Sequence, residues 1–161
     1  MELASNLKDK LFKVLMYLTQ TKEEFEMVAD EIEEHNLKTA LNGLSMESSL
    51  YASELCIQLQ TLGISLNTPS CSELTGANGM PLHATMPGKG NELHYICSKS
   101  EDVIVNAYKN ILSESVSLPG IYDLMMYQLN ALKFAFTKIK MLNAARCNYK
   151  LNSNFSMLTT D

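Results

Sequence analysis

An apolar stripe between residues 118 and 142 constrains the fold of this chain more than any other feature of its sequence. Apolar side chains recur there every three or four residues for about six helical turns. The stripe consists of Leu118, Tyr122, Met125, Leu129, Leu132, Phe136 and Ile139. A long helix with one apolar face is stable in water only when other helices cover that face. The stripe therefore predicts a bundle of packed helices.

Three other segments carry matching stripes and complete the predicted bundle. The expected helices span residues 5–34, 37–62, 91–115 and 118–145. In the first helix, apolar positions from Leu7 to Ile32 alternate steps of four and three residues, which is typical of helices that cross at about 20°. Short joints at residues 35–36 and 117–120 make the helices on either side antiparallel neighbours. We expect an all-α four-helix bundle of two antiparallel helix pairs.

Residues 63–90 form a long central connection between the two pairs and are rich in Pro, Gly, Ser and Asn. At about 3.3 Å per extended residue, this segment is long enough to run from one end of the bundle to the other. The end of the first helix is acidic and the end of the last helix is basic, so the two ends attract when they are adjacent. We therefore predict that the connection crosses the bundle and brings Glu34 near Ala145. The tail at residues 146–161 loses the helical period and is predicted to be irregular.

Length and composition narrow the class of protein. A chain of 161 residues with 46% hydrophobic and 19% charged residues fits one globular domain over residues 1–161. A net charge of -5 without clustered Lys and Arg argues against a nucleic-acid partner, because phosphate binding requires cationic patches. No apolar run spans a bilayer, and the first residues lack the pattern of a signal peptide. We expect a cytoplasmic protein with no membrane partner.

The cysteines show neither a metal-binding nor a redox motif. Cys56, Cys71, Cys97 and Cys147 are widely separated and include no CxxC pair. Free thiols of this kind are typical of a reducing compartment, and no cationic neighbour in the sequence marks an activated thiolate. No Ser, Cys or His residue lies in a recognisable nucleophile context. We therefore predict no catalytic residue and no bound cofactor, and the chain is interpreted as a non-enzyme.

Several short motifs along the chain point to a known family. They are Glu54, Leu62–Gly63, Cys97, Glu101–Asp102, Ala107–Tyr108, Leu118–Pro119, Gln128, Ala135 and Ile139, with residues 72–79 and Leu82–His83 as a shortened connection. Over residues 11–142 the chain resembles a bacterial ferritin-like family that is catalogued as a domain of unknown function. Stress-associated bundles of the YciE/YciF kind share its general fold. The resemblance implies a ferritin-like four-helix bundle and a role in the bacterial stress response.

The chain departs from that family at two positions that bear on metal binding. Di-iron and di-manganese bundles use carboxylates from all four helices and Glu-x-x-His pairs on two of them. No Glu-x-x-His occurs here. In our alignment, Lys22 stands where the family has an acidic residue and Phe136 where it has a histidine. We therefore expect no metal site.

Three glutamates are the weak candidates for a surviving metal site. Glu24 and Glu47 are equidistant from the joint at residues 35–36, and Glu101 falls on the stripe of the third helix. If they converge, they are the remaining ligands of an iron or manganese centre. The alternative, which we favour, is that Glu24 and Glu47 bond to neighbours or water and that Glu101 pairs with a Lys, a Tyr or Gln128.

Three functions remain open at this stage. The first is a non-enzymatic bundle that acts by interaction or self-association, as a homodimer. Its support is the excess of apolar residues beside the stripes, such as Ile57 and Phe134. The second is a divergent di-metal carboxylate protein that acts as an oxidase, a peroxide scavenger or an iron store. The third is a carrier with a small-molecule pocket between its helices.

Overall fold

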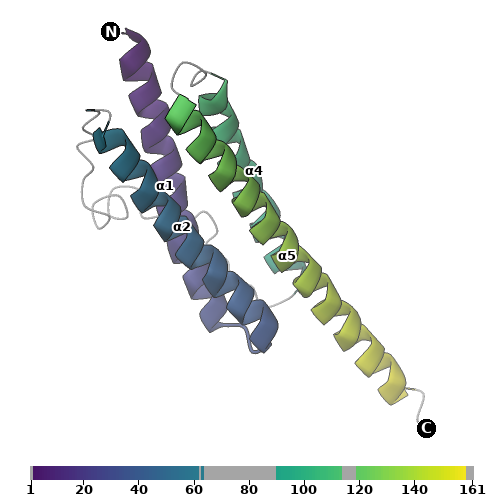
Figure 1. Cartoon of the computed structure of the whole chain (residues 1–161). Coiled ribbons are helices and arrows are strands. Elements are labelled where there is room, and N and C mark those ends of the chain that lie inside the picture. Colours follow the sequence, from purple (N-terminus) through teal and green to yellow (C-terminus); the bar gives the residue numbers. More distant parts are fainter. Residues whose placement is uncertain (1, 62, 64–89, 114–118, 159–161) are drawn as a thin grey trace.

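A computed structural model describes the backbone of residues 2–61, 63, 90–113 and 119–158, and the side chains of 6–61, 63, 92–113 and 120–148. It contains four helices, α1 (Glu2–Asp30), α2 (His35–Thr61), α4 (Gly90–Leu112) and α5 (Pro119–Leu158), which Figure 1 shows as one elongated assembly. These ranges include no strand. The prediction of an all-α protein with four helices is confirmed. The predicted connection lies almost entirely outside the described residues, as do Cys71 and His83.

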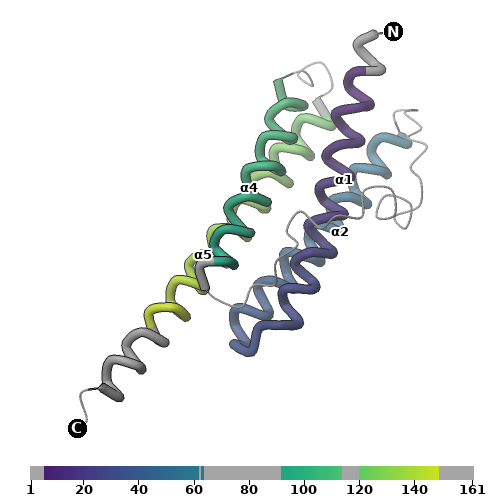
Figure 2. The backbone as a smooth tube through the Cα atoms, turned by 180° about the vertical axis from the view of Figure 1, so that it is seen from behind, coloured from purple at the N-terminus to yellow at the C-terminus, as the bar shows by residue number. Residues whose placement is uncertain are grey.

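The four helices pack in a ring around one hydrophobic core. α1 contacts α2 and α4, and α5 contacts the same two helices from the other side. Figure 1 shows α2 and α5 at the front, and Figure 2 shows the assembly from behind. α1 and α5 therefore face each other diagonally across the core.

Contacts between side chains place the ends of the helices. Arg146 of α5 lies 3.4 Å from Glu34, which follows α1 (Nη1 to Oε2), as the charge argument predicted. The other end of the bundle holds the end of α2 and the start of α5, since the Gln58 amide lies beside Gly120. Between these ends, Glu101 in the middle of α4 contacts Lys140 of α5, and Tyr108 of α4 contacts Gln128 of α5.

The core contains the stripe from which the prediction started. Met125, Leu132, Phe136 and Ile139 are fully buried. The Phe136 ring meets Phe25 of α1 edge-on, with ring centroids 5.8 Å apart and planes at 77°. This contact joins the two diagonal helices across the centre of the bundle.

The helix boundaries all differ from the sequence-based expectation, and the two largest differences are at the ends of α5 and α1. The prediction of an irregular tail from residue 146 is wrong, because α5 continues to Leu158 and projects beyond the turn between α1 and α2 (Figure 1). No Pro or Gly after Gly120 interrupts it, and a helix satisfies its backbone hydrogen bonds without packing partners. The first helix ends at Asp30, where three-residue turns follow, with Glu31 N–H donating to the Val28 carbonyl. Gly63, just after α2, has a positive φ of 72°, which is typical of a glycine that follows the end of a helix.

We predict that Phe136→Ala lowers the free energy of unfolding by about 3 to 5 kcal/mol, because it leaves a cavity at the most buried contact of the bundle. Chemical denaturation measures this loss. Tyr95→Ala is the matched control, since Tyr95 is 54% exposed, and it should cost less than about 1 kcal/mol. Equal losses for the two variants would contradict the assignment of Phe136 to the core.

Candidate functional site

Polar side chains from three helices meet in the interior of the bundle, close to Cys97. Cys97 and Ser100 lie one turn apart on α4, and both are buried. The Ser100 hydroxyl donates to Glu24 of α1 over 3.5 Å. Lys140 of α5, which also lies near Cys97, forms an ion pair with Glu101 of α4. These five residues are the centre of the candidate site.

The Cys97 thiol is held in its protonated form. Burial raises the pKa of Cys97 to about 12, and the charges of Glu101 and Glu24 add to that rise while Lys140 opposes it. A thiol nucleophile or metal ligand has to be a thiolate. Cys97 is therefore a buried apolar side chain, in keeping with the usual behaviour of free cysteine.

Glu24 titrates close to neutral pH. Burial raises the pKa of Glu24 from 4.5 to about 7, and the hydrogen bond from Ser100 offsets part of this rise. Above pH 7 the bundle therefore contains an ionised carboxylate in a poorly hydrated place, which costs stability.

The three predicted metal candidates do not form a joint site. Among the described side chains, no group of three or more His, Cys, Asp and Glu residues is arranged to hold a metal ion. Glu24 and Glu101 both lie near Cys97. Glu47 responds to Lys138 instead, whose charge opposes the rise that burial causes in the pKa of Glu47. The alternative in which Glu101 pairs with a lysine is confirmed by its contact with Lys140.

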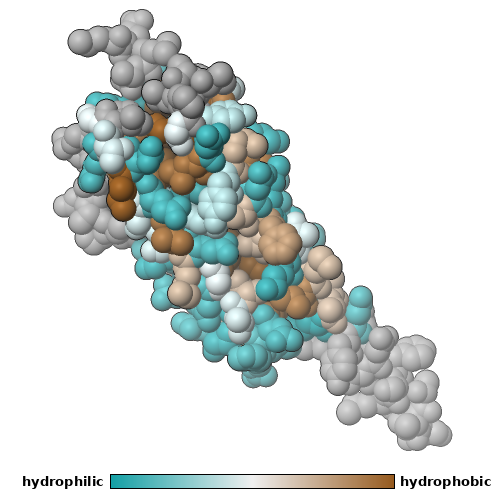
Figure 3. Space-filling view, in the orientation of Figure 1, coloured by the Kyte–Doolittle hydropathy of each residue, from teal (hydrophilic) through white to brown (hydrophobic). Residues whose placement is uncertain are grey.

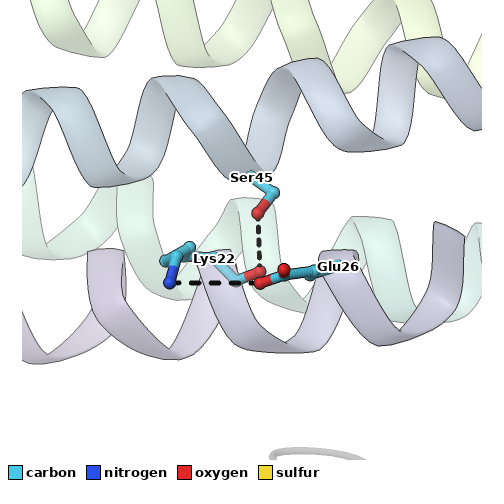
Figure 4. A network of polar contacts seen from close by, with 3 residues as sticks. All are labelled: Lys22, Glu26 and Ser45. Atoms are coloured by element: carbon cyan, nitrogen blue, oxygen red, sulfur yellow. Dashed lines mark hydrogen bonds and ion pairs between the residues drawn. The ribbon is translucent and has the colours of Figure 1, made fainter. Parts of the chain in front are cut away.

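Lys22, which replaces an acidic residue in our alignment, lies on the outside of the bundle. Figure 4 shows Lys22 beside Glu26 of the same helix, with the Lys22 carbonyl accepting a hydrogen bond from Ser45 of α2. The Lys22 Nζ to Glu26 Oε2 distance is 4.0 Å, and the Ser45 Oγ to Lys22 O distance is 2.9 Å. Beside these residues is a shallow hollow between α1 and α2 that opens at the surface. A carrier pocket between the helices is not supported by this hollow.

A second polar layer in the core was missed by the sequence analysis. The Tyr108 hydroxyl donates to the Gln128 side-chain carbonyl over 2.8 Å. The Gln128 amide nitrogen donates to the Tyr51 backbone carbonyl over 3.1 Å and to Glu54 over 3.3 Å. Burial raises the pKa of Tyr108 and raises that of Tyr51 to about 12, so both remain neutral donors. The sequence feature that could have indicated this layer was Gln128, a polar residue beside the apolar stripe of α5.

The residues that would have to hold a di-metal centre do not fit that role. Phe136 fills the centre and packs on Phe25, and a phenyl ring coordinates nothing. Lys140 brings a positive charge to Glu101, where a metal ligand would need a free carboxylate. No reaction step is therefore assigned to a metal, and its absence from the protein stays a prediction.

Comparisons with known proteins were made at the level of families, sequences and structures. No family model, curated protein or solved structure matches the chain. The functional interpretation therefore rests on the geometry of the chain itself.

We predict that Glu24→Gln stabilises the protein above pH 7 and has little effect below pH 4.5. The folded state binds the Glu24 proton more tightly than the unfolded chain does, since the pKa of Glu24 is raised from 4.5 to about 7. Its contribution to stability is therefore complete below pH 4.5 and is lost as the pH rises through 7. Thermal unfolding from pH 4 to 8 measures the effect. Glu26→Gln, at an exposed position of the same helix, should not reproduce this dependence.

Elemental analysis tests the prediction about metals. Protein purified without a chelator should contain far less than one iron, manganese or zinc atom per chain, because carboxylates without imidazole bind these ions weakly. Finding about one or two atoms per chain that disappear in Glu101→Ala would contradict this prediction. Glu31→Ala, at an exposed position, is the control for nonspecific loss.

Proposed function

We propose that this protein is a non-enzymatic, ferritin-like bundle that acts by self-association through an apolar face on α2 and α5. The observation that carries the proposal is the distribution of exposed apolar side chains. Among the large exposed apolar residues that the structure describes, all except Met27 and Tyr95 lie on these two adjacent helices.

This α2–α5 face consists of Met46, Leu50, Ile57, Tyr127, Phe134 and Met141. Phe134 and Met46 are each 73% exposed. Figure 3, drawn from the side on which α2 and α5 lie in front, shows apolar side chains across the middle of the molecule. Beneath these side chains the Tyr51 and Tyr127 rings meet edge-on, with centroids 6.1 Å apart, and Tyr51 itself is buried. Met46 and Leu50 also border the hollow between α1 and α2. Exposed apolar side chains gathered on adjacent helices are typical of a protein interface.

The interior of the bundle supports a structural role. Burial keeps the Cys97 thiol protonated, Lys140 is paired with Glu101, and Tyr108 and Gln128 bond to each other. Each of these groups is engaged in packing or in hydrogen bonds, which is typical of a polar network that orders a core. A divergent di-metal role would have to rely on Glu24 and Glu101 alone.

The ferritin-like part of the proposal is supported by the positions of the helix ends. The contacts of Arg146 with Glu34, Lys140 with Glu101 and Gln58 with Gly120 agree with two antiparallel pairs whose connection crosses the bundle. This is the arrangement of ferritin-like folds. A stress-related role follows only from the resemblance described above.

We also propose that the protein works in the cytoplasm and binds neither nucleic acid nor membranes. None of the described helices has the length and the apolar character required to cross a membrane. Cys56, Cys97 and Cys147 are free thiols, as expected in a reducing compartment. The net charge of -5 disfavours contact with phosphate backbones and anionic lipid.

We predict a homodimer with twice the 18.0 kDa mass of the chain, measured by light scattering over a concentration series. The double variant Phe134→Lys and Met141→Lys should be monomeric and folded, because it places two charges in the apolar face. Met27→Lys is the matched control, since Met27 is 62% exposed but lies on α1, and it should remain dimeric. A monomeric wild-type chain at every concentration would contradict the proposed function.

A further inference from the structure

Helix α5 presents a second, outward-facing stripe in addition to the one that forms the core. Tyr127, Phe134 and Met141 are spaced seven residues apart and are 62%, 73% and 68% exposed. Residues seven apart on a straight α-helix drift by only about 20° per step. The three side chains therefore lie along one line on the outside of the bundle.

Exposed residues of α5 recur at two positions in every seven, with a second position three residues after each large apolar side chain. Asn130, Thr137 and Ala144 lie three residues after each of these large side chains, and all three are exposed. In the sequence the same alternation of three and four residues continues through Asn148, Leu151, Phe155 and Leu158. The first position of this repeat is apolar at residues 127, 134 and 141, as in a coiled coil, whereas the second is polar or small at residues 130, 137 and 144.

The backbone of α5 is suited to such a contact because it is longer than the bundle. Arg146 already lies at the end of the bundle beside Glu34, and the helix continues to Leu158. At 1.5 Å per residue this part rises about 18 Å further. Figure 1 shows it projecting past the turn between α1 and α2. The seven-residue repeat therefore runs from the bundle onto a segment of helix that extends beyond it.

The lysines beside the stripe decide the direction in which a second α5 can pair. The helical period places Lys133 and Lys138 on its two sides, and Lys138 also lies near Glu47 of α2. In a parallel, in-register pair, the flanking positions that meet across the interface are five residues apart. Lys133 would then face Lys138 of the partner subunit, twice in a symmetric dimer, and like charges disfavour that arrangement. In an antiparallel pair each of these lysines faces a neutral residue.

We propose that two copies of this chain associate through antiparallel α5 helices, with Met141 of one copy opposite Ala144 of the other. This inference rests on the proposed self-association and specifies its geometry. The register sets Thr137 opposite Asn148, so that polar residues meet, and sets Phe134 at the level of position 151, where the sequence has a leucine. The projecting end of each α5 then covers the exposed stripe of its partner, and a two-fold axis closes the assembly.

Cysteine cross-linking tests the direction and the register together. The background chain carries Cys56→Ser, Cys71→Ser and Cys147→Ser and retains the buried Cys97. Thr137→Cys and Asn148→Cys are placed in separate chains with different tags, and both positions are exposed. The two chains are co-expressed and oxidised, and covalent dimers are detected on a denaturing gel. Asp102→Cys, at an exposed position of α4, replaces Thr137→Cys in the control.

The expected result is a covalent heterodimer from the Thr137→Cys and Asn148→Cys chains and almost none from either chain alone. In the proposed register, identical positions lie about 16 Å apart along the axis, whereas a disulfide needs Cα atoms within about 7 Å. Cross-linking of each variant with itself would show parallel pairing and overturn the inference. A dimer by light scattering that forms neither product would also overturn it and leave the proposed self-association intact. A monomer would refute both.

Discussion

The packing of Phe136 on Phe25 is the contact on which the rest of the structure depends. It joins α1 and α5 across the centre of a ring in which these two helices are not neighbours. Because interiors are close-packed, a rigid ring pair at this point fixes how far apart the four helices lie. The polar layers on either side of it then meet at hydrogen-bonding distance.

Those two polar layers have different consequences. The layer of Tyr108, Gln128 and Tyr51 consists of neutral groups whose hydrogen bonds are made inside the core, and such a layer stabilises one register of the helices. The layer of Glu24, Ser100 and Cys97 contains an acid whose pKa is raised by burial to about 7. The second layer therefore makes the stability of the bundle depend on pH close to neutrality.

The exposed apolar residues on the outer surface also result from the packing of four helices in a ring. A helix in a four-helix ring buries roughly one side, so apolar residues on its opposite side stay exposed unless another chain covers them. On α5 the inner stripe contains Phe136 and the outer stripe contains Phe134, only two residues apart. One helix can thus serve the core of its own chain and an interface with a second copy.

The sequence by itself determined the four helices, the burial of Phe136 and the proximity of Glu34 to the residue-146 region of α5. Helical period and charge are local properties of the chain, so they can be read from residue spacing. Only the tertiary structure decided that Glu101 meets Lys140, that Gln128 meets Tyr108 and that, among the described residues, the three candidate glutamates form no metal-binding group. Spacing specifies which side of a helix a residue occupies, but the axial offset between helices depends on how their side chains interlock. The continuation of α5 past residue 146 was likewise not predicted, because the core stripe ends before it and a helix outside the bundle needs no apolar face toward the core.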